Sequence, residues 1–186
     1  LINLYNFIDG IDGYASTEGI IVFLTLGLLY NNSLFIIFAS IIVGFLFWNW
    51  QDSKIFLGDV GSTFIGFNIF IMAVYYQNTS SIPLISWVIL LSLFWYDATI
   101  TIIRRIKANE QITTPHKKHA YQRIVQYGFS HQKTVLYSIV INIIFVILVI
   151  ISKYYPFMLI PSLFITIIIT SVIYIIIERK KPFYKN

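Results

Sequence analysis

The chain of 186 residues contains no cysteine and has few charged side chains. Without cysteine it can form neither a disulfide framework nor a thiolate zinc site, and it has no cysteine nucleophile. Only 11% of its residues are charged, against about 25% in a typical soluble domain, while 58% are hydrophobic and the mean hydropathy is +0.77. A chain this short still exposes roughly a third of the surface it could bury. The composition therefore excludes a soluble globular or disordered protein and indicates a membrane-embedded one.

Long stretches of the chain contain no charged residue. Residues 19–51 and 60–96 are uncharged over 33 and 37 positions, and one helical crossing of a bilayer takes about 20 apolar residues. Each stretch therefore predicts two spans, whereas residues 134–152 and 154–177 predict one span each. Continuous Ile-rich runs without alternation favour helices over barrel strands. We expect an all-α polytopic membrane protein, a single membrane domain with six spans at about 15–30, 34–48, 61–76, 83–103, 133–152 and 157–177.

The net charge of +5 is distributed unevenly across these spans. Twelve of the 13 Lys and Arg residues fall in segments on one side of the predicted membrane, and Lys153 alone falls on the other. Lysine and arginine gather in cytoplasmic loops, so the rich side is predicted to be cytoplasmic. All acids and histidines lie on that side or just inside it. The positive charge is therefore an orientation signal and does not indicate a nucleic-acid partner.

A first candidate site is a block of amides, carboxylates and glycines: Asn3, Asn6, Asp9, Gly10, Asp12 and Gly13. The two amides lie one helical turn apart, and the glycines permit tight backbone turns. Two carboxylates and two amides suit a hard cation, or a nucleotide diphosphate held through one. The alternative is a turn between two helices, with Asn and Asp acting as caps.

The second candidate site is the segment 58–62, where Asp59 lies between glycines at the start of a predicted span. The helix dipole and open amides at Gly61 and Ser62 would favour an anion there. A carboxylate beside that anion would require a divalent ion between them. In the alternative interpretation, Asp59 or Ser62 is simply the N-cap of the span.

The third candidate site is the segment 104–123, which contains six cations and two histidines. The guanidinium groups of arginines such as Arg104 and Arg123, together with the lysine ammonium groups, suit phosphate groups. Anionic lipid headgroups would also attract the lysines. The pair His116 and His119 is spaced three apart, without a third zinc ligand at motif spacing. We therefore prefer phosphate or sugar contacts for these two. His131 is interpreted as an ordinary loop residue.

Asp97 lies inside the fourth predicted span, about 10 Å from Arg104 along a helix. An acid within a span is functional by default. The alternatives are an ion pair with Arg104 or Arg105, or an extension of the side chain to the interface. Asp97 also motivates a second hypothesis, that of a polytopic transporter. The uncharged outer halves of the spans argue against it.

The three blocks, in this order, resemble the polyprenyl-phosphate N-acetylhexosamine-1-phosphate transferases. The family's Asn-x-x-Asn-x-x-Asp-Gly-x-Asp-Gly block is matched at residues 3–13 and its Gly-Asp-x-Gly-Ser block at 58–62. Arg104 and Arg105, followed by the segment 116–123, match its Arg-Arg and His-rich loop, in a form most similar to the O-antigen-initiating branch. Family members have ten or eleven spans and an Asp-Asp pair in an earlier loop that this chain lacks. The resemblance thus implies the carboxy-terminal part of a longer enzyme, with part of the lipid-phosphate site outside this chain.

The resemblance implies a glycosyltransferase of the bacterial inner (plasma) membrane, with its active face in the cytoplasm, that initiates cell-envelope glycans such as lipopolysaccharide. It would transfer an N-acetylhexosamine 1-phosphate from a UDP-sugar to undecaprenyl phosphate and release UMP, with Mg²⁺ or Mn²⁺ as cofactor. Its partners would be the UDP-sugar, the polyprenyl phosphate and the bilayer. The implied roles follow: a metal ligand (Asp59), positions holding the diphosphate and its metal (Asn6, Asp9, Asp12), and a loop contacting sugar and pyrophosphate (His116, His119, Arg123).

The CDP-alcohol phosphatidyltransferases are a third possible class, because their motif also begins with Asp-Gly. That motif requires Ala-Arg soon after the first Asp-Gly and two further spaced aspartates. Here Ile11 and Asp12 follow Asp9 and Gly10, so the transferase acting on a UDP-sugar is the preferred hypothesis.

Overall fold

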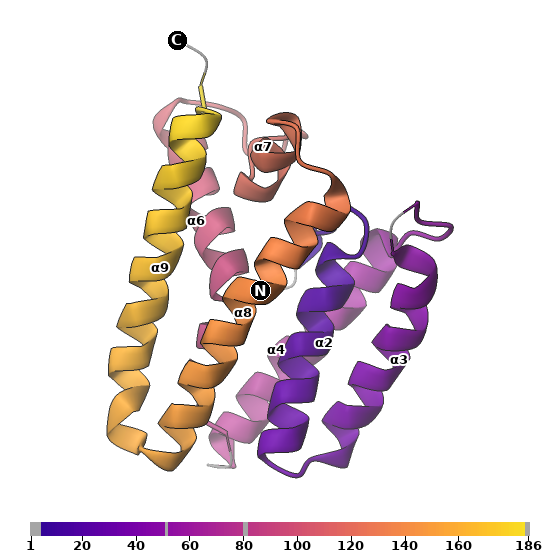
Figure 1. The fold of residues 1–186 in the computed structure, drawn as a ribbon, viewed down its shortest axis with the longest axis vertical. Helices are drawn as coiled ribbons and strands as arrows, with labels where there is room; N and C mark the ends of the chain where they lie inside the picture. Colours follow the sequence, from indigo (N-terminus) through magenta and orange to yellow (C-terminus); the bar gives the residue numbers. More distant parts are fainter. Residues whose placement is uncertain (1–4, 51, 80–81, 185–186) are drawn as a thin grey trace.

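A computed structural model describes residues 5–50, 52–79 and 82–184. These residues form helices and turns with no strand among them, as the sequence predicts (Figure 1). The elements in chain order are α2 (Tyr14–Leu29), α3 (Ser33–Asn49), α4 (Gly58–Asn78), α5 (Leu84–Leu90), α6 (Ser92–Lys107), α7 (Ala120–Gln126), α8 (His131–Tyr154), the 3₁₀ turn η1 (Pro156–Met158) and α9 (Leu159–Lys180).

The connections gather at the two ends of the helix bundle. Figure 1 shows the turn between α2 and α3, together with η1, at one end. The short helix α7, the loop between α3 and α4 and the carboxy-terminal segment lie at the other. This second end contains the segments that carry nearly all the lysines and arginines, so the division of charge that the sequence predicts is also a division in space.

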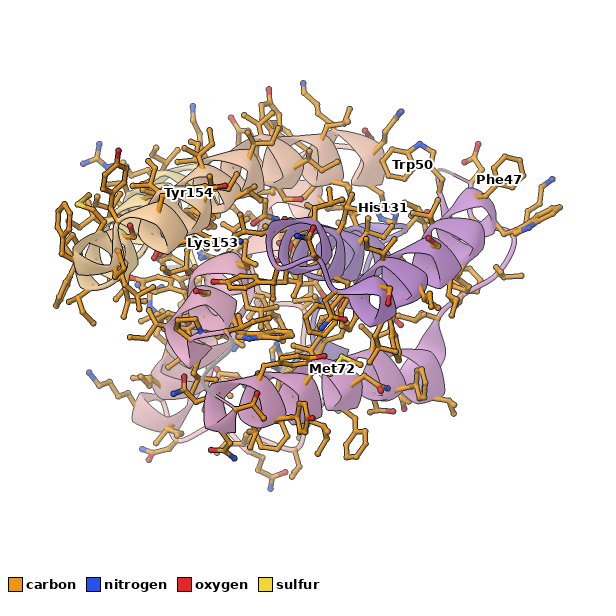
Figure 2. The ribbon with its side chains drawn as sticks, turned by 90° about the horizontal axis from the view of Figure 1, so that it is seen from below. Phe47, Trp50, Met72, His131, Lys153 and Tyr154 are labelled. Carbon is orange, nitrogen blue, oxygen red and sulfur yellow. The ribbon has the colours of Figure 1, made fainter. Side chains whose placement is uncertain are left out.

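The outside of the bundle is apolar. Phe47 on α3 extends away from the bundle and is 79% exposed, whereas Met72 on α4 turns inward and is 9% exposed (Figure 2). Exposed Ile, Leu, Val and Phe side chains continue along α3, α4, α8 and α9. Polar side chains such as Asn142, Thr166 and Thr170 are buried between the helices. Lipid outside and small polar groups inside are the pattern of packed membrane helices.

All six predicted spans are helical in the structure. Three of them, α4, α8 and the run Pro156–Lys180, are long and apolar enough to cross a membrane, and α5 with α6 adds a fourth if the pair is one broken span. Helices α2 and α3 are apolar but shorter, at 16 and 17 residues. At 1.5 Å per residue they reach about 24–26 Å, a little less than the hydrocarbon core. Their crossing therefore stays a prediction.

The segment predicted as the fourth span, 83–103, is divided into two helices in the structure. Helices α5 and α6 meet at a bend of 77°. The Ser92 hydroxyl donates to the carbonyls of Val88 at 3.0 Å and Ile89 at 2.7 Å, and the indole of Trp95 donates to Val88 at 2.9 Å. These side chains supply partners for carbonyls at the break. Because neither Pro nor Gly marks the bend, its position is not visible in the hydropathy pattern.

Candidate functional site

The three predicted carboxylates, Asp9, Asp12 and Asp59, border one hollow of about 350 Å³, which we name the aspartate hollow. It lies between the segment before α2 and the first turn of α4, although these are about 50 residues apart in the chain. Its walls comprise Asn6, Asp9, Gly10, Ile11, Asp12, Asn49, Phe56, Gly58, Asp59 and His131. The structure thus brings the first two sequence blocks together. Asn3, also predicted for this site, lies outside the described residues.

The first block folds as a series of tight turns. The amide of Ile8 donates to the Tyr5 carbonyl and that of Asp9 to the Asn6 carbonyl, both at 3.2 Å. The turns end at Gly13, whose φ of +73° lies in the left-handed region where a side chain would be strained. The buried Tyr5 hydroxyl donates to the Ala15 carbonyl at 2.5 Å and fixes this segment to α2. The predicted use of glycine at Gly13 is therefore confirmed.

Asp9 and Asp59 both line the hollow, and the negative charge of Asp59 acts on Asp9. Burial raises the pKa of Asp9 to about 6; a hydrogen bond from the Gly58 amide opposes the rise, and the negative charge of Asp59 adds to it. Asp59 itself is exposed, in the first turn of α4. A carboxylate whose ionisation is opposed by a neighbouring carboxylate marks a position where a cation would be stabilised.

Asp12 is held by two neighbours. The Ser53 hydroxyl donates to its Oδ1 at 2.8 Å, and Nδ1 of His131 lies 3.1 Å from its Oδ2. The interpretation of His131 as an ordinary loop residue is therefore wrong, because the first residue of α8 borders the hollow. Sequence reasoning missed it because 119 positions separate the pair. His131 is the histidine among the residues that line the aspartate hollow.

Asn49, which the sequence analysis did not single out, joins the blocks. Its buried Oδ1 accepts from the Gly13 amide at 3.1 Å and the Ser16 hydroxyl at 3.2 Å, while its Nδ2 donates to the Ile55 carbonyl at 2.9 Å. One amide at the end of α3 therefore fixes both the start of α2 and the loop leading to Asp59. An Asn ending an apolar run was the signal that could have revealed it.

The start of α4 differs from the capping alternative. The helix begins at Gly58 with Leu57 at the N-cap position, so neither Asp59 nor Ser62 caps it. The Ser62 hydroxyl donates to Oδ1 of Asn6 at 2.5 Å and ties the second block to the first. The expectation of an open amide at Gly61 is wrong, because that amide donates to the Leu57 carbonyl at 3.2 Å. Asp59 and Asn6 thus remain as the polar groups offered to a ligand here.

The carboxylates do not by themselves complete a metal cage. Among the residues that the structure describes, no group of three or more His, Cys, Asp or Glu side chains converges closely enough to hold a metal ion. Mg²⁺ commonly binds through one or two carboxylates together with substrate phosphates and waters. The oxygen donors of Asp9 and Asp59, with the Asn6 amide nearby, fit that open arrangement better than a closed site.

The basic segment 104–118 is organised by Arg105, whose side chain is 2% exposed. Its Nε donates to Glu110 at 3.0 Å, Nη1 to the Ile112 carbonyl at 3.1 Å, and Nη2 to the Gln111 carbonyl and the Thr114 hydroxyl at 2.5 and 2.9 Å. Lys118 also forms an ion pair with Glu110. Arg105 therefore holds the loop in shape, and its donors are already used.

Glu110 gives this loop a predictable pH dependence. Hydrogen bonds from Lys118, then from Arg105 and Tyr184, lower the pKa of Glu110 to about 2. A lowered pKa stabilises the fold above the carboxyl's ordinary value near 4.5, and the contribution is lost as the pH falls towards 2. We expect Glu110→Gln to lower the melting temperature by about 2–4 °C at pH 6, with the difference shrinking between pH 4.5 and 3. Thermal unfolding of both proteins in detergent measures it, and a difference independent of pH would contradict the assignment.

Arg104 and Arg123 meet at the end of α9 rather than at the hollow. Nη1 of each donates to Oε2 of Glu178 at 2.7 Å. Arg123 is buried, and its Nη1 also donates to the Lys181 carbonyl at 2.9 Å. Glu178, which the sequence analysis did not single out, thus joins α6, α7 and α9. Neither arginine lies among the residues that form the walls of the aspartate hollow.

The two predicted histidines also lie outside those walls. His119 is buried, and its Nδ1 lies 3.4 Å from Oδ2 of Asp97. The ring of His116 is 5.0 Å from that of His119. Burial, reinforced by the neighbouring His119 and Arg105, lowers the pKa of His116 to about 4, so its imidazole is neutral near pH 7.

Asp97 has a structural partner that neither alternative named. Its Oδ1 and Oδ2 accept from the Ala120 amide at 2.8 and 2.9 Å, at the start of α7. The ion pair with Arg104 or Arg105 expected as an alternative is not found, because both arginines pair with glutamates. Asp97 therefore fixes the start of α7, together with the preceding His119, to α6.

The segment 116–123, which contains the two histidines, nevertheless contacts the first sequence block at Phe7. The Tyr121 hydroxyl donates to the Phe7 carbonyl at 2.7 Å, and the Phe7 ring stacks on His119 at 5.7 Å. The same hydroxyl fills the space where Gly10 would carry a Cβ. Gly10 borders the hollow, so the three sequence blocks form one continuous unit in which the third supports the first.

Comparison with known proteins agrees with these motifs. The family described as Glycosyl transferase family 4 matches residues 1–77. A Bacillus subtilis (strain 168) protein named "Probable undecaprenyl-phosphate N-acetylglucosaminyl 1-phosphate transferase" is 35% identical over 98% of this chain and 55% of its own length. The undecaprenyl-phosphate alpha-N-acetylglucosaminyl 1-phosphate transferase of Thermotoga maritima is 28% identical over 83% of this chain and 50% of its own length. The decaprenyl-phosphate N-acetylglucosaminephosphotransferase of Mycobacterium leprae is 28% identical over 73% and 41%.

The chain is therefore a multi-pass membrane protein of glycosyl transferase family 4. Within this group it belongs to the polyprenyl-phosphate N-acetylhexosamine-1-phosphate transferase family, as the three sequence blocks predicted. It spans about half the length of the curated relatives it matches. No solved structure matches it.

Proposed function

We propose that the full-length protein containing this chain transfers N-acetylglucosamine 1-phosphate from its UDP derivative to a polyprenyl phosphate, at the cytoplasmic face of the bacterial inner membrane. The observation that carries the proposal is the aspartate hollow, where two family motifs meet. The sugar and the lipid acceptor follow the names of the relatives, which specify N-acetylglucosamine with undecaprenyl or decaprenyl phosphate. The product would begin a cell-envelope glycan; O-antigen stays a prediction from the sequence.

The charge of the hollow argues for a divalent cation as cofactor. Its walls carry three carboxylates and one imidazole, whereas Arg104, Arg105, Arg123 and Lys118 are paired with Glu110 or Glu178. A diphosphate entering such a site would meet negative potential, and an oxygen-liganded cation reverses it. Asp9 and Asp59 would hold this ion, and Mg²⁺ when bound would neutralise the charge on the transferring phosphate. Mn²⁺ offers the same chemistry.

The reaction needs alignment more than covalent help. An oxygen of the acceptor phosphate forms a bond to the β-phosphorus, and the bond from that phosphorus to the oxygen bridging the two phosphates breaks. UMP leaves with that oxygen and its electron pair, while the bond from the sugar to the β-phosphate stays intact. In phosphoryl transfer of this kind, catalysis comes mainly from positioning and electrostatics. No protein nucleophile is required.

The described residues have separate tasks in this scheme. Asp9 and Asp59 supply negative charge at the hollow, and Asn6, fixed by Ser62, supplies an amide for the diphosphate or its metal. Asp12 is oriented by its contacts with Ser53 and His131. Arg105 holds the loop at residues 110–114 in shape.

The transporter hypothesis is less well supported. It depended on Asp97 offering a free carboxylate inside a span. Both oxygens of that carboxylate accept from the Ala120 amide, and Thr101 donates to one of them at 3.3 Å. A carboxylate that caps a helix in this way is not free to carry an ion through the membrane.

The proposed activity is tested by exchange of labelled UMP into UDP-N-acetylglucosamine, using membranes that contain the full-length protein, polyprenyl phosphate and Mg²⁺. We expect exchange that depends on both the lipid phosphate and the cation, and that is weaker with UDP-glucose. Uptake of the UDP-sugar into vesicles without exchange would contradict the proposal and favour transport.

A further inference from the structure

A second hollow lies away from the aspartate hollow, between the ends of α7, α8 and α9. In Figure 1, α8 and α9 separate from each other above η1, and α7 lies at the open end. This α8–α9 groove has a volume of about 430 Å³. It is lined by Arg123, Ile124, Tyr127, Phe129, Thr134, Tyr137, Ile141, Ile173, Ile176, Ile177, Lys180 and Lys181. It shares none of these residues with the aspartate hollow.

The groove has an apolar body and a basic mouth. Its body is formed by isoleucines of α8 and α9, both of which are long and apolar enough to cross a membrane. Its mouth carries Lys180 and Lys181, at the charged end of α9. The ammonium of Lys180 lies 5.9 Å from the ring of Tyr127, at the same mouth. No carboxylate lies among the lining residues that the structure describes.

Arg123 adds an unused pair of donors beside the groove. The residue is 2% exposed, and its Nη1 is paired with Glu178. Its Nε and Nη2 have no hydrogen-bond partner in the described part of the chain. The centroids of the Tyr174 and Phe183 rings lie 4.9 and 5.5 Å from its guanidinium carbon. A buried guanidinium edge without an acceptor favours an anionic ligand with two oxygens, such as a phosphate.

We propose that the α8–α9 groove binds an anionic phospholipid of the surrounding membrane, with one acyl chain along the isoleucines and the phosphate at Lys180, Lys181 and Arg123. The match between a chain-shaped apolar body and a basic mouth at the predicted cytoplasmic boundary supports a lipid over a soluble anion. This inference does not depend on the proposed enzymatic reaction, because the two hollows have separate walls.

The groove also borders a narrower cavity of about 70 Å³ that leads towards Asp97 and Tyr14 and shares Ile141, Ile173 and Ile177 with it. A bound phospholipid would cover the outer end of this cavity. Such a lipid would stabilise the packing of α7, which carries Tyr121 and thereby supports the first sequence block. The ligand would thus act on stability and on the site's support, without touching a reacting atom.

Photolabelling tests this proposal on the full-length protein in nanodiscs. The probe is phosphatidylglycerol with a diazirine in one acyl chain, and phosphatidylcholine with the same chain is the neutral probe. We expect phosphatidylglycerol to label the peptides of α8 and α9 that contain Tyr137, Ile141 and Ile176. Each basic group at a membrane surface strengthens anionic lipid binding about fivefold, so Lys180→Gln with Lys181→Gln should reduce this labelling about 25-fold.

Two further variants separate charge from shape. Lys107→Gln with Arg179→Gln removes the same charge at the same end of the molecule, from exposed residues that do not line the groove. We expect this control to keep wild-type labelling. Ile176→Trp keeps both lysines and fills the groove from a position that is 54% exposed, so it should also abolish labelling. Thermal unfolding of each variant verifies that the fold is intact.

The results that overturn the proposal are distinct. Equal labelling by phosphatidylcholine would show an apolar groove without selection for the phosphate. Loss of label on adding excess polyprenyl phosphate would assign the groove to the acceptor substrate instead. Absence of label in α8 and α9 of the wild-type protein would show that another protein surface covers the groove. None of these outcomes bears on UMP exchange, which tests the proposed function separately.

Discussion

The Asp59→Asn variant of the full-length protein is expected to exchange UMP into the UDP-sugar at least 100-fold more slowly than the wild type. Loss of one electrostatic group in a preorganised site typically costs about 10²–10³ in rate. Asp59 is exposed and borders the hollow, whereas Gly58, Ser53 and His131 hold the carboxylates of Asp9 and Asp12. The change therefore removes charge from the site without removing structural support. The measurement is the initial rate of exchange at saturating Mg²⁺.

Asp52→Asn is the matched control for this prediction. Asp52 lies in the loop that precedes α4 and is exposed, but it does not border the hollow. Its φ of +57° is tolerated by Asn, so the substitution changes charge alone. Wild-type exchange by Asp59→Asn, or an equal loss in both variants, would remove Asp59 from the proposed chemistry.

Arg105→Lys is expected to destabilise the protein by about 2–3 kcal/mol, despite keeping the positive charge. A lysine cannot reproduce the planar fork that serves Glu110 and the carbonyls of Gln111 and Ile112 at once. Acceptors left unpaired near a buried position account for a cost of this size. The melting temperature in detergent should fall by about 5–10 °C, and limited proteolysis should cut within residues 108–118.

Arg179→Lys provides the comparison for this substitution. Arg179 is exposed at the end of α9, and the same exchange there should change the melting temperature by less than about 1 °C. An unchanged melting temperature and unchanged protease resistance in Arg105→Lys would mean that the loop does not depend on the fork.

Composition and charge placement were enough to predict the all-α membrane fold, because long uncharged runs have few alternatives inside a bilayer. The break between α5 and α6 could not be predicted, since the side chains that satisfy it, Ser92 and Trp95, are common within membrane helices. The lengths of α2 and α3 also depend on their ends, where Asn32 and Asn49 make specific hydrogen bonds.

The candidate site could be predicted in part. The motifs predict Asp9, Asp12 and Asp59 one at a time, and the structure brings them around one hollow. His131 was missed because a lone histidine carries no pattern, and its contact with Asp12 depends on tertiary packing. The sequence predicts Arg104 and Arg123 as cations that bind phosphate. Their pairing with Glu178 could not be foreseen, because the acid lies 74 and 55 positions away.

The central claim is that Asp9 and Asp59 together bind a divalent cation that in turn holds the diphosphate. Its most direct test is Mn²⁺ binding to the full-length protein in nanodiscs, followed by electron paramagnetic resonance with and without UDP-N-acetylglucosamine. We predict one tight Mn²⁺ site that strengthens with the nucleotide and is lost in both Asp9→Asn and Asp59→Asn, but kept in Asp52→Asn. Unchanged Mn²⁺ affinity in the first two variants would contradict the claim.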